Sequence, residues 1–157
     1  MYTPVFMKMA LGISESSRCQ RRQVGCVLVN DGQAVAAGVN GAPMHSNICL
    51  LEGCYRLMHN IPSGEQLDKC FAVHAEQAAI LQAVLTGRDI YGAEAYLTCP
   101  PCMTCLKLLA HVGCKDIYCL DTGYEATDFT AALCRELDID IVRIPRENWE
   151  HYESTQQ

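Results

Sequence analysis

The sequence lacks any apolar stretch that approaches the roughly 18 residues of a membrane-spanning helix. Its start, Met1 to Gly12, has no long apolar run behind a basic segment, so we predict no signal peptide. Aromatic residues make up only 7% and charged residues 19%, while half of the residues are apolar, which is typical of a globular protein rather than a disordered one. No internal repeat or low-complexity segment is present. These features predict a single domain over residues 1–157.

Basic residues are also scarce. Lys and Arg number 12 against 18 Asp and Glu, which gives a net charge of −6. Long nucleic acids bind dense basic surfaces, so this balance argues against a duplex or tRNA partner. Arg18, Arg21 and Arg22 form the one basic cluster. Because a few local cations suffice for one phosphate group, the cluster is either an anion site or a solvated helix end.

Cysteine, in contrast, is abundant, with 11 residues. Without a secretion signal, this number implies a reducing compartment in which thiols bind metals or pack as small apolar groups. We therefore predict a cytoplasmic protein.

The predicted secondary structure alternates between strands and helices after an opening hairpin. Strands are predicted at residues 24–29, 33–39, 93–98, 116–120 and 139–144. Helices are predicted at residues 3–17, from His74 to about 85, at 102–111 and at 126–136. This order predicts an α/β fold, a three-layer α-β-α arrangement with a sheet of about five strands. A polar tail, 145–157, follows.

The strongest motif is His74-Ala75-Glu76, followed by Pro101-Cys102-Met103-Thr104-Cys105. His74, Cys102 and Cys105 are nitrogen and sulfur ligands of the kind that hold Zn²⁺ in catalytic sites, where a fourth position stays open. Glu76 is not a ligand in this interpretation, and it can act as a general acid and base. The order His-x-Glu and then Pro-Cys-x-x-Cys is that of zinc-dependent nucleobase deaminases.

Both halves of the motif are predicted at helix N-termini. The residues after His74 are good helix formers with apolar side chains all round, which predicts a buried helix. Pro101 suits the first position of the second helix, because its missing N–H would be unpaired there. Cys102 and Cys105 are three residues apart and then share one helix face. The positive end of each helix favours thiolate.

Other interpretations of the motif use fewer of its residues. A Cys-x-x-Cys pair can be a structural zinc knuckle or a redox pair, and a histidine can be an ordinary core residue. A structural zinc takes four protein ligands, however, and has no use for Glu76. A cysteine-protease pair of Cys102 and His74 would leave Cys105 and Glu76 without roles. The catalytic zinc accounts for all four residues.

The segment 40–73 has no sustained periodicity and is far longer than a usual connection of about 4–6 residues. It is rich in metal-binding residue types: His45, Cys49, Cys54, His59 and Cys70. Together with Cys19 from the end of the first helix, Cys49, Cys54 and Cys70 are candidate ligands of a second, structural zinc. The alternative is that these cysteines are small buried apolar residues.

Four blocks of this chain resemble the cytidine/deoxycytidylate deaminases, and within them the deoxycytidylate (dCMP) deaminases. The blocks are Val24-Gly25-Cys26-Val27-Leu28-Val29, Gly38-Val39-Asn40-Gly41-Ala42-Pro43, the His74 segment up to Ile80, and Pro101 to Leu109. The resemblance covers roughly Cys19 to Ile144. The zinc motif is shared by all relatives, whereas the Asn-Gly-x-Pro loop and the Cys-rich insertion resemble the dCMP branch, some of whose bacterial and phage members hold an extra zinc.

The resemblance implies a cytidine-deaminase-like sheet and hydrolysis of dCMP to dUMP and ammonia, which supplies dUMP for thymidylate synthesis. It implies that Glu76 moves protons between water, N3 and the leaving amine. It also implies that Asn40 lies against the sugar or base and that the Ala75 N–H reads the ring carbonyl. Tyr124 is a candidate to close over the sugar, or else a packed loop aromatic.

The family resemblance also implies a homo-oligomer, with a hexamer as the usual form, and a response to the effectors dCTP and dTTP. Val39 stands where the family usually has Tyr, and His45 lies where Gly is usual, which puts this regulation in doubt rather than the chemistry. The alternatives are a deaminase of dCTP, of deoxycytidine or of a tRNA adenosine, and, in another class, a zinc-stapled binding module in which Glu76 is idle.

Overall fold

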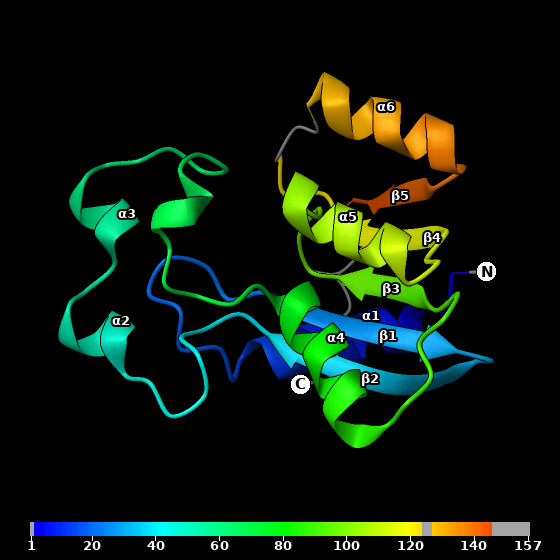
Figure 1. Ribbon diagram of the computed structural model, residues 1–157, viewed down its shortest axis with the longest axis horizontal. Helices are drawn as coiled ribbons and strands as arrows, with labels where there is room; N and C mark the ends of the chain where they lie inside the picture. The colour runs from blue at the N-terminus through cyan, green and yellow to red at the C-terminus, as the bar shows by residue number, and fades with distance from the viewer. Residues whose placement is uncertain (1, 124–126, 146–157) are drawn as a thin grey trace.

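A five-stranded mixed sheet forms the centre of the protein, as seen in a computed structural model that describes residues 2–123 and 127–145 (Figure 1). The strands are β1 (Gly25–Asn30), β2 (Gln33–Val39), β3 (Glu94–Leu97), β4 (Asp116–Leu120) and β5 (Asp140–Ile144). Their order is β2-β1-β3-β4-β5. β1 is antiparallel to both β2 and β3, whereas β3, β4 and β5 run parallel. The predicted hairpin and the number of strands are confirmed.

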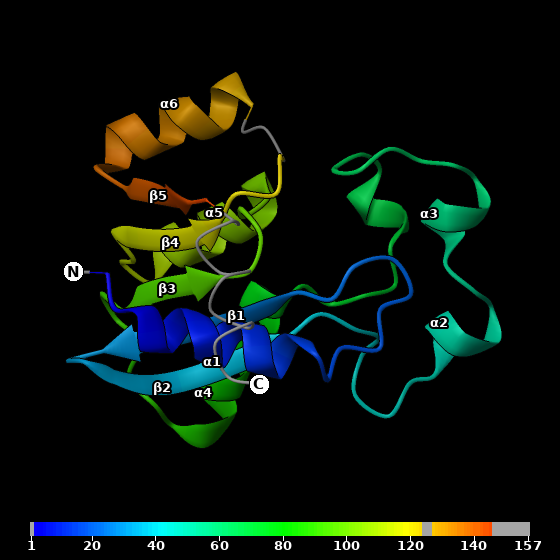
Figure 2. The same ribbon diagram turned by 180° about the vertical axis from the view of Figure 1, so that it is seen from behind.

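Helices cover both faces of this sheet. They are α1 (Pro4–Ser14), α4 (Ala75–Thr86), α5 (Met103–His111) and α6 (Asp128–Leu137). Met7 and Ala10 of α1 pack with Val27 and Tyr96 in one core, while α4 and α5 pack on the opposite face. Figure 1 shows α4 and α5 in front of the sheet, and Figure 2 shows α1 on the other side. The predicted three-layer arrangement is confirmed.

The central position of β1 follows from its composition. Four consecutive residues, Cys26 to Val29, are almost fully buried because one face meets α1 and the other meets α4. A strand with two apolar faces is expected between two others in a covered sheet. β1 accordingly lies between β2 and β3.

The segment 40–73 leaves the sheet as an insertion and returns to it. An isolated bridge joins its ends, with Gly41 N–H donating to Val73 O at 3.1 Å and Val73 N–H to Gly41 O at 2.8 Å. The insertion contains two one-turn helices, α2 (Ile48–Leu51) and α3 (Tyr55–Met58), and a short 3₁₀ turn, Leu67–Lys69. Figure 1 shows α2 and α3 standing to one side of the sheet. The sequence gives no periodic signal for such short helices.

Three predicted details are wrong. The first helix ends at Ser14 rather than at residue 17. The hydroxyl groups of Ser14 and Ser16 donate to the backbone carbonyls of Leu11 and Ile13, and such side-chain bonds compete with the backbone hydrogen bonds of a helix. Pro101 precedes the helix instead of opening it, because Cys102 is the N-cap of α5. The helix after His74 is not buried all round, since its outer face is exposed at three apolar residues: Leu81, Val84 and Leu85.

No helix in the described residues is long and apolar enough to cross a membrane.

The packing of α4 on the sheet depends on Gly38 in β2. A Cβ at this position would lie 2.3 Å from Ala79 N and 2.4 Å from Ala75 O, which are backbone atoms of α4. The helix that carries His74 and Glu76 can therefore approach the sheet only because residue 38 has no side chain.

Gly38→Ala is expected to destabilise the protein, because α4 must move away from β2 to admit a methyl group. We expect a loss of about 1–3 kcal/mol in the free energy of unfolding, measured by urea denaturation. Gly12→Ala is the matched control, since nothing lies within 4 Å of a Cβ there in α1. It should be neutral or stabilising by up to about 1 kcal/mol. Equal effects of the two substitutions would contradict the close approach.

Candidate metal centre and active site

The N-terminus of α4 presents His74 and Glu76 to the same space. His74 is the N-cap residue, and its backbone N–H donates to Gln77 Oε1 at 2.8 Å, which fixes the start of the helix. Glu76 lies in the first turn and is only 5% exposed. A carboxyl group is rarely buried without a functional or structural partner, so its place beside the histidine marks this helix end as the centre of the site.

The N-terminus of α5 brings the two cysteines to the same point. Cys102 has extended backbone angles as the N-cap, with φ −74° and ψ 165°, and Cys105 lies in the first turn and is fully buried. His74 Nδ1 lies 3.5 Å from Cys102 Sγ and 3.3 Å from Cys105 Sγ. His74 and Cys102 are the N-cap residues of two neighbouring helices, so the three predicted ligands lie close together.

The spacing of these three groups fits a zinc ion. All three ligand atoms lie within 4.8 Å of one another. With Zn–S bonds of about 2.3 Å and Zn–N bonds of about 2.0–2.1 Å, tetrahedral angles place sulfur and nitrogen about 3.6 Å apart. The observed sulfur–nitrogen distances are close to this value, so the donors could hold a metal without moving far.

Hydrogen bonds among His74, Cys102 and Cys105 shift the pKa values of these residues in different directions. The bond from Cys105, joined by that from His74, lowers the pKa of Cys102 to about 4. The same bond to Cys102, with burial, raises the pKa of Cys105. Bonding to Cys102 raises the pKa of His74, although burial and the nearby charge of Arg56 oppose the rise. This arrangement favours the thiolate form of Cys102, the form that binds a metal.

Burial raises the pKa of Glu76, and the negative charge of Cys102 adds to this effect. Glu76 lines the same cavity as His74 and Cys102. A carboxyl group in this position can exchange protons with whatever occupies the cavity.

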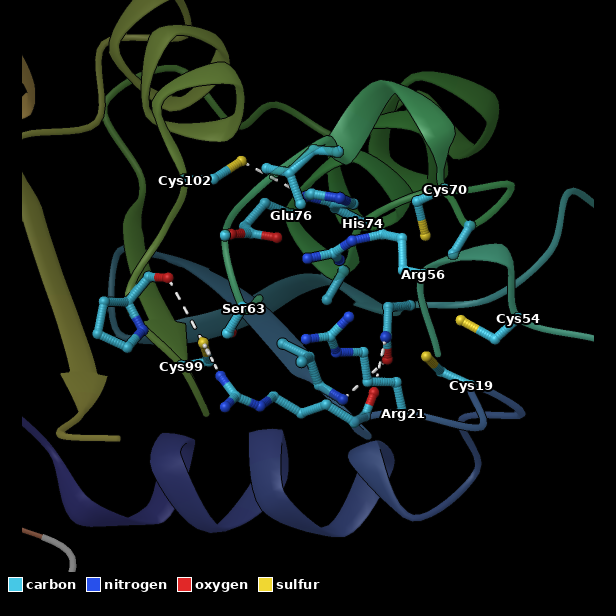
Figure 3. Close-up of a pocket in the computed structure, with 18 residues that line it drawn as sticks. Cys19, Arg21, Cys54, Arg56, Ser63, Cys70, His74, Glu76, Cys99 and Cys102 are labelled. Carbon is cyan, nitrogen blue, oxygen red and sulfur yellow. Dashed lines mark hydrogen bonds between the residues drawn. The ribbon is translucent and has the colours of Figure 1, made fainter. Parts of the chain in front are cut away.

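The cavity beside these residues has a volume of about 130 Å³ (Figure 3). Its lining comes from the N-termini of α4 and α5, from the segment before β1 and from the insertion. The residues with polar or sulfur-containing side chains are Cys19, Arg21, Arg22, Asn40, Cys54, Arg56, Ser63, Cys70, His74, Glu76, Cys99 and Cys102. The cavity has the mixed, convergent lining of a small-molecule site.

The predicted substrate residues have different positions. Ala75 is fully buried and lines the cavity. Asn40 also lines it, but its side chain already bonds to protein: Oδ1 accepts from Val24 N–H at 2.8 Å and from the Ser17 hydroxyl at 2.7 Å, and Nδ2 donates to Arg22 O at 2.8 Å. Asn40 therefore holds the wall of the cavity together. Tyr124 lies outside the described residues.

Several lining residues were missed by the sequence analysis, among them Arg56 and Cys99. Arg56, in α3, has no pattern around it that would distinguish it from any surface arginine. Cys99 accepts a hydrogen bond from Arg22 Nη1 at 3.4 Å and lies two residues after the end of β3. A position just after a strand of the sheet was the one available signal for Cys99. Of the basic cluster, Arg21 and Arg22 line the cavity, whereas Arg18 does not.

The four cysteines proposed for a second metal gather in one region. Cys19, Cys54 and Cys70 line the cavity, and Figure 3 shows all three. Burial raises the pKa of Cys49, and the charges of Cys70, Cys19 and Cys54 raise it further. Within residues 2–123 and 127–145, however, only His74, Cys102 and Cys105 come within metal-binding distance of one another. The four sulfur atoms do not form a closed ligand set.

The sequence matches a known family over residues 3–121, described as the cytidine and deoxycytidylate deaminase zinc-binding region. The chain belongs to this family. The matched region is described as zinc-binding, and His74, Cys102 and Cys105 have the geometry that fits a zinc ion.

Two yeast relatives of this chain are deoxycytidylate deaminases. A deoxycytidylate deaminase of Schizosaccharomyces pombe is 36% identical over 91% of this chain and 44% of its own length. One of Saccharomyces cerevisiae is 38% identical over 71% of this chain and 35% of its own length. This chain therefore spans less than half the length of either yeast relative.

Among solved structures, the dCMP deaminase of cyanophage S-TIM5 in complex with dCMP and dUMP superimposes with a TM-score of 0.70. It is 28% identical and covers 92% of this chain and 99% of its own. Unlike the yeast proteins, it matches this chain almost end to end.

Cys105→Ser is expected to remove the metal at this centre, because a serine hydroxyl replaces a thiolate ligand. The loss in zinc affinity should exceed the roughly 10–100-fold that removal of an outer-shell partner costs. Metal analysis after dialysis against a weak chelator measures it. Cys134→Ser, in α6 and outside the cavity, is the control. Full zinc retention by Cys105→Ser would contradict the ligand assignment.

Proposed function

We propose that this protein deaminates dCMP hydrolytically to dUMP and ammonia. The observation that carries the proposal is the buried carboxyl of Glu76 beside three groups that fit a zinc ion, in a cavity that also contains arginines. The likeness to a protein whose structure contains dCMP and dUMP supports the choice of substrate.

The reaction adds water to C4 of cytosine and expels the amino group. His74, Cys102 and Cys105 would hold the zinc ion, which would make a bound water molecule acidic enough to react near neutral pH. Glu76 accepts one proton from the water and delivers it to N3 of the ring, while the water oxygen bonds to C4. Glu76 then takes the second proton from the oxygen on C4 and delivers it to the amino group, so that the C4–N bond breaks and ammonia leaves. The oxygen from water becomes the C4 carbonyl oxygen of uracil.

The remaining predicted residues orient the base and sugar in this proposal. The buried N-terminal turn of α4 offers the Ala75 N–H to the ring carbonyl. Asn40 keeps the entrance in place through its bonds to Ser17, Val24 and Arg22. Tyr124 as a cover over the sugar stays a prediction.

Glu76→Gln is expected to retain zinc and to lose about 10²–10⁴-fold in kcat, because the amide cannot transfer protons. Ammonia release from dCMP and zinc content are measured on the same sample. Glu136→Gln, exposed on α6, is the matched control and should keep full activity. Activity of Glu76→Gln like that of the unchanged protein would refute the role of this carboxyl. Absence of ammonia release from the unchanged protein with zinc bound would instead favour the binding-module alternative.

We also propose a second zinc held by Cys19, Cys49, Cys54 and Cys70. The proposal is supported by the mutual electrostatic influence of these thiols, which come from separate segments of the chain. Binding would draw the sulfur atoms together to the distances of a tetrahedral site. A zinc here would tie the insertion to the end of α1.

Metal analysis tests this second site by its stoichiometry. The unchanged protein should contain about two zinc ions per chain, and Cys49→Ser combined with Cys54→Ser should contain about one, because closed structural sites need four ligands. The double variant should retain the zinc at His74. A content near one in both proteins would mean that these thiols pack without metal.

Assembly and regulation stay predictions from the family resemblance. The exposed apolar residues Leu81, Val84 and Leu85 on α4 support self-association into a homo-oligomer, because a contiguous apolar face is uncommon on a monomer. A response to dCTP and dTTP and a hexameric state belong to the same set of predictions.

A further inference from the structure

Asn40 lines the catalytic cavity with its side-chain amide held in one orientation. Oδ1 accepts from the backbone N–H of Val24 at 2.8 Å, and Nδ2 donates to the backbone carbonyl of Arg22 at 2.8 Å. A backbone N–H can only donate and a carbonyl can only accept, so these two partners determine which end of the amide is oxygen and which is nitrogen. The amide cannot turn over without the loss of both bonds.

The amide nitrogen of Asn40 has a second N–H group, and Arg22 accepts from only one of the two. Within the described residues, no other acceptor contacts Nδ2 of Asn40. Because the side chain lines the cavity, this second N–H is the group that Asn40 can offer to a ligand there. Its direction depends on how firmly the rest of the amide is held.

Ser17, beyond the end of α1, contacts both oxygen atoms of Asn40. Its hydroxyl donates at 2.7 Å to Asn40 Oδ1 and at 2.7 Å to the Asn40 backbone carbonyl oxygen. A hydroxyl has one proton, which these two acceptors share, so one group ties the Asn40 side chain to its own backbone. Ser17 is only 6% exposed, which limits competition from water for this proton.

Ser17 is itself held by neighbouring polar groups. Its N–H donates to Ser14 O at 2.9 Å, its carbonyl accepts from Gln23 Nε2 at 3.0 Å, and its hydroxyl oxygen accepts from Cys19 N–H at 3.2 Å. The hydroxyl accepts from Cys19 on one side and is left to donate to Asn40 on the other. The position of the hydroxyl is therefore set before any ligand enters the cavity.

We propose that Ser17 is a positioning residue of the active site and that it acts through Asn40. Ser17 does not line the cavity itself, whereas the amide that it holds does. The inference rests on the proposed deamination of dCMP, in which Asn40 lies against the sugar or base. Without the hydroxyl, the amide tilts about its bonds to Val24 and Arg22, and its second N–H meets the ligand at a poorer angle.

Kinetics of dCMP deamination by Ser17→Ala test this role. We expect kcat/KM to fall about 3- to 10-fold, as for one weakened hydrogen bond to a bound ligand, with the loss in KM rather than in kcat. Ser16→Ala is the matched control, because the Ser16 hydroxyl bonds to Ile13 O on the exposed side of the chain, and it should change neither constant. An unchanged KM in Ser17→Ala would overturn the proposal.

A double-mutant cycle with Asn40→Ala separates positioning from general destabilisation. Once the amide is absent, Ser17→Ala has nothing left to position, so adding it to Asn40→Ala should change KM by less than about twofold. If the second substitution instead lowers kcat/KM as much as it does in the unchanged protein, Ser17 acts on the fold rather than through Asn40, and the proposal is wrong.

Hydrogen exchange at the Val24 amide provides a readout that needs no substrate. This N–H donates to Asn40 Oδ1, so a less firmly held side chain in Ser17→Ala should speed its exchange about 3- to 10-fold, with no change in Ser16→Ala. Equal rates in Ser17→Ala and the unchanged protein would contradict the hold of Ser17 on Asn40. If the unchanged protein fails to deaminate dCMP, the proposed function fails, while exchange at Val24 still decides whether Ser17 positions Asn40.

Discussion

The meeting of two helix N-termini is the constraint on which the rest of the site depends. α4 and α5 begin with His74 and Cys102 as N-cap residues, and the next turns contribute Glu76 and Cys105. Each helix end directs unpaired N–H groups and partial positive charge toward the same point. That arrangement stabilises thiolates. It also requires the two helices to lie on one face of the sheet at a fixed depth, which Gly38 permits for α4.

The insertion contributes a wall to the cavity beside this centre. The three groups that fit zinc and the buried carboxyl of Glu76 lie at the N-termini of α4 and α5, whereas Arg56 comes from a segment outside these helices. Such a division would let changes in the insertion alter the ligand while the metal centre stays the same. The cysteines near Arg56 have a structural part in this view, because Cys54 is the N-cap residue of α3, the helix that carries Arg56.

The sheet and the metal centre could be predicted from sequence because their signals are local. A short run of apolar residues located β1, and residue types with helix-compatible spacing located His74 and Cys102. The insertion could not be predicted in detail, since its shape depends on contacts between distant residues, such as the bridge between Gly41 and Val73. Arg56 was missed for the same reason: its importance comes from burial in a cavity, and nothing near it in the sequence indicates burial.

The cavity combines groups that are unfavourable to bury: a carboxyl at Glu76, a thiolate at Cys102 and unpaired guanidinium nitrogens at Arg21 and Arg56. Each of them lowers the stability of the protein by itself. A metal cation held by the thiolate and an anion held by the arginines would each offset part of this cost, so the folded chain is expected to be more stable with both bound than with neither.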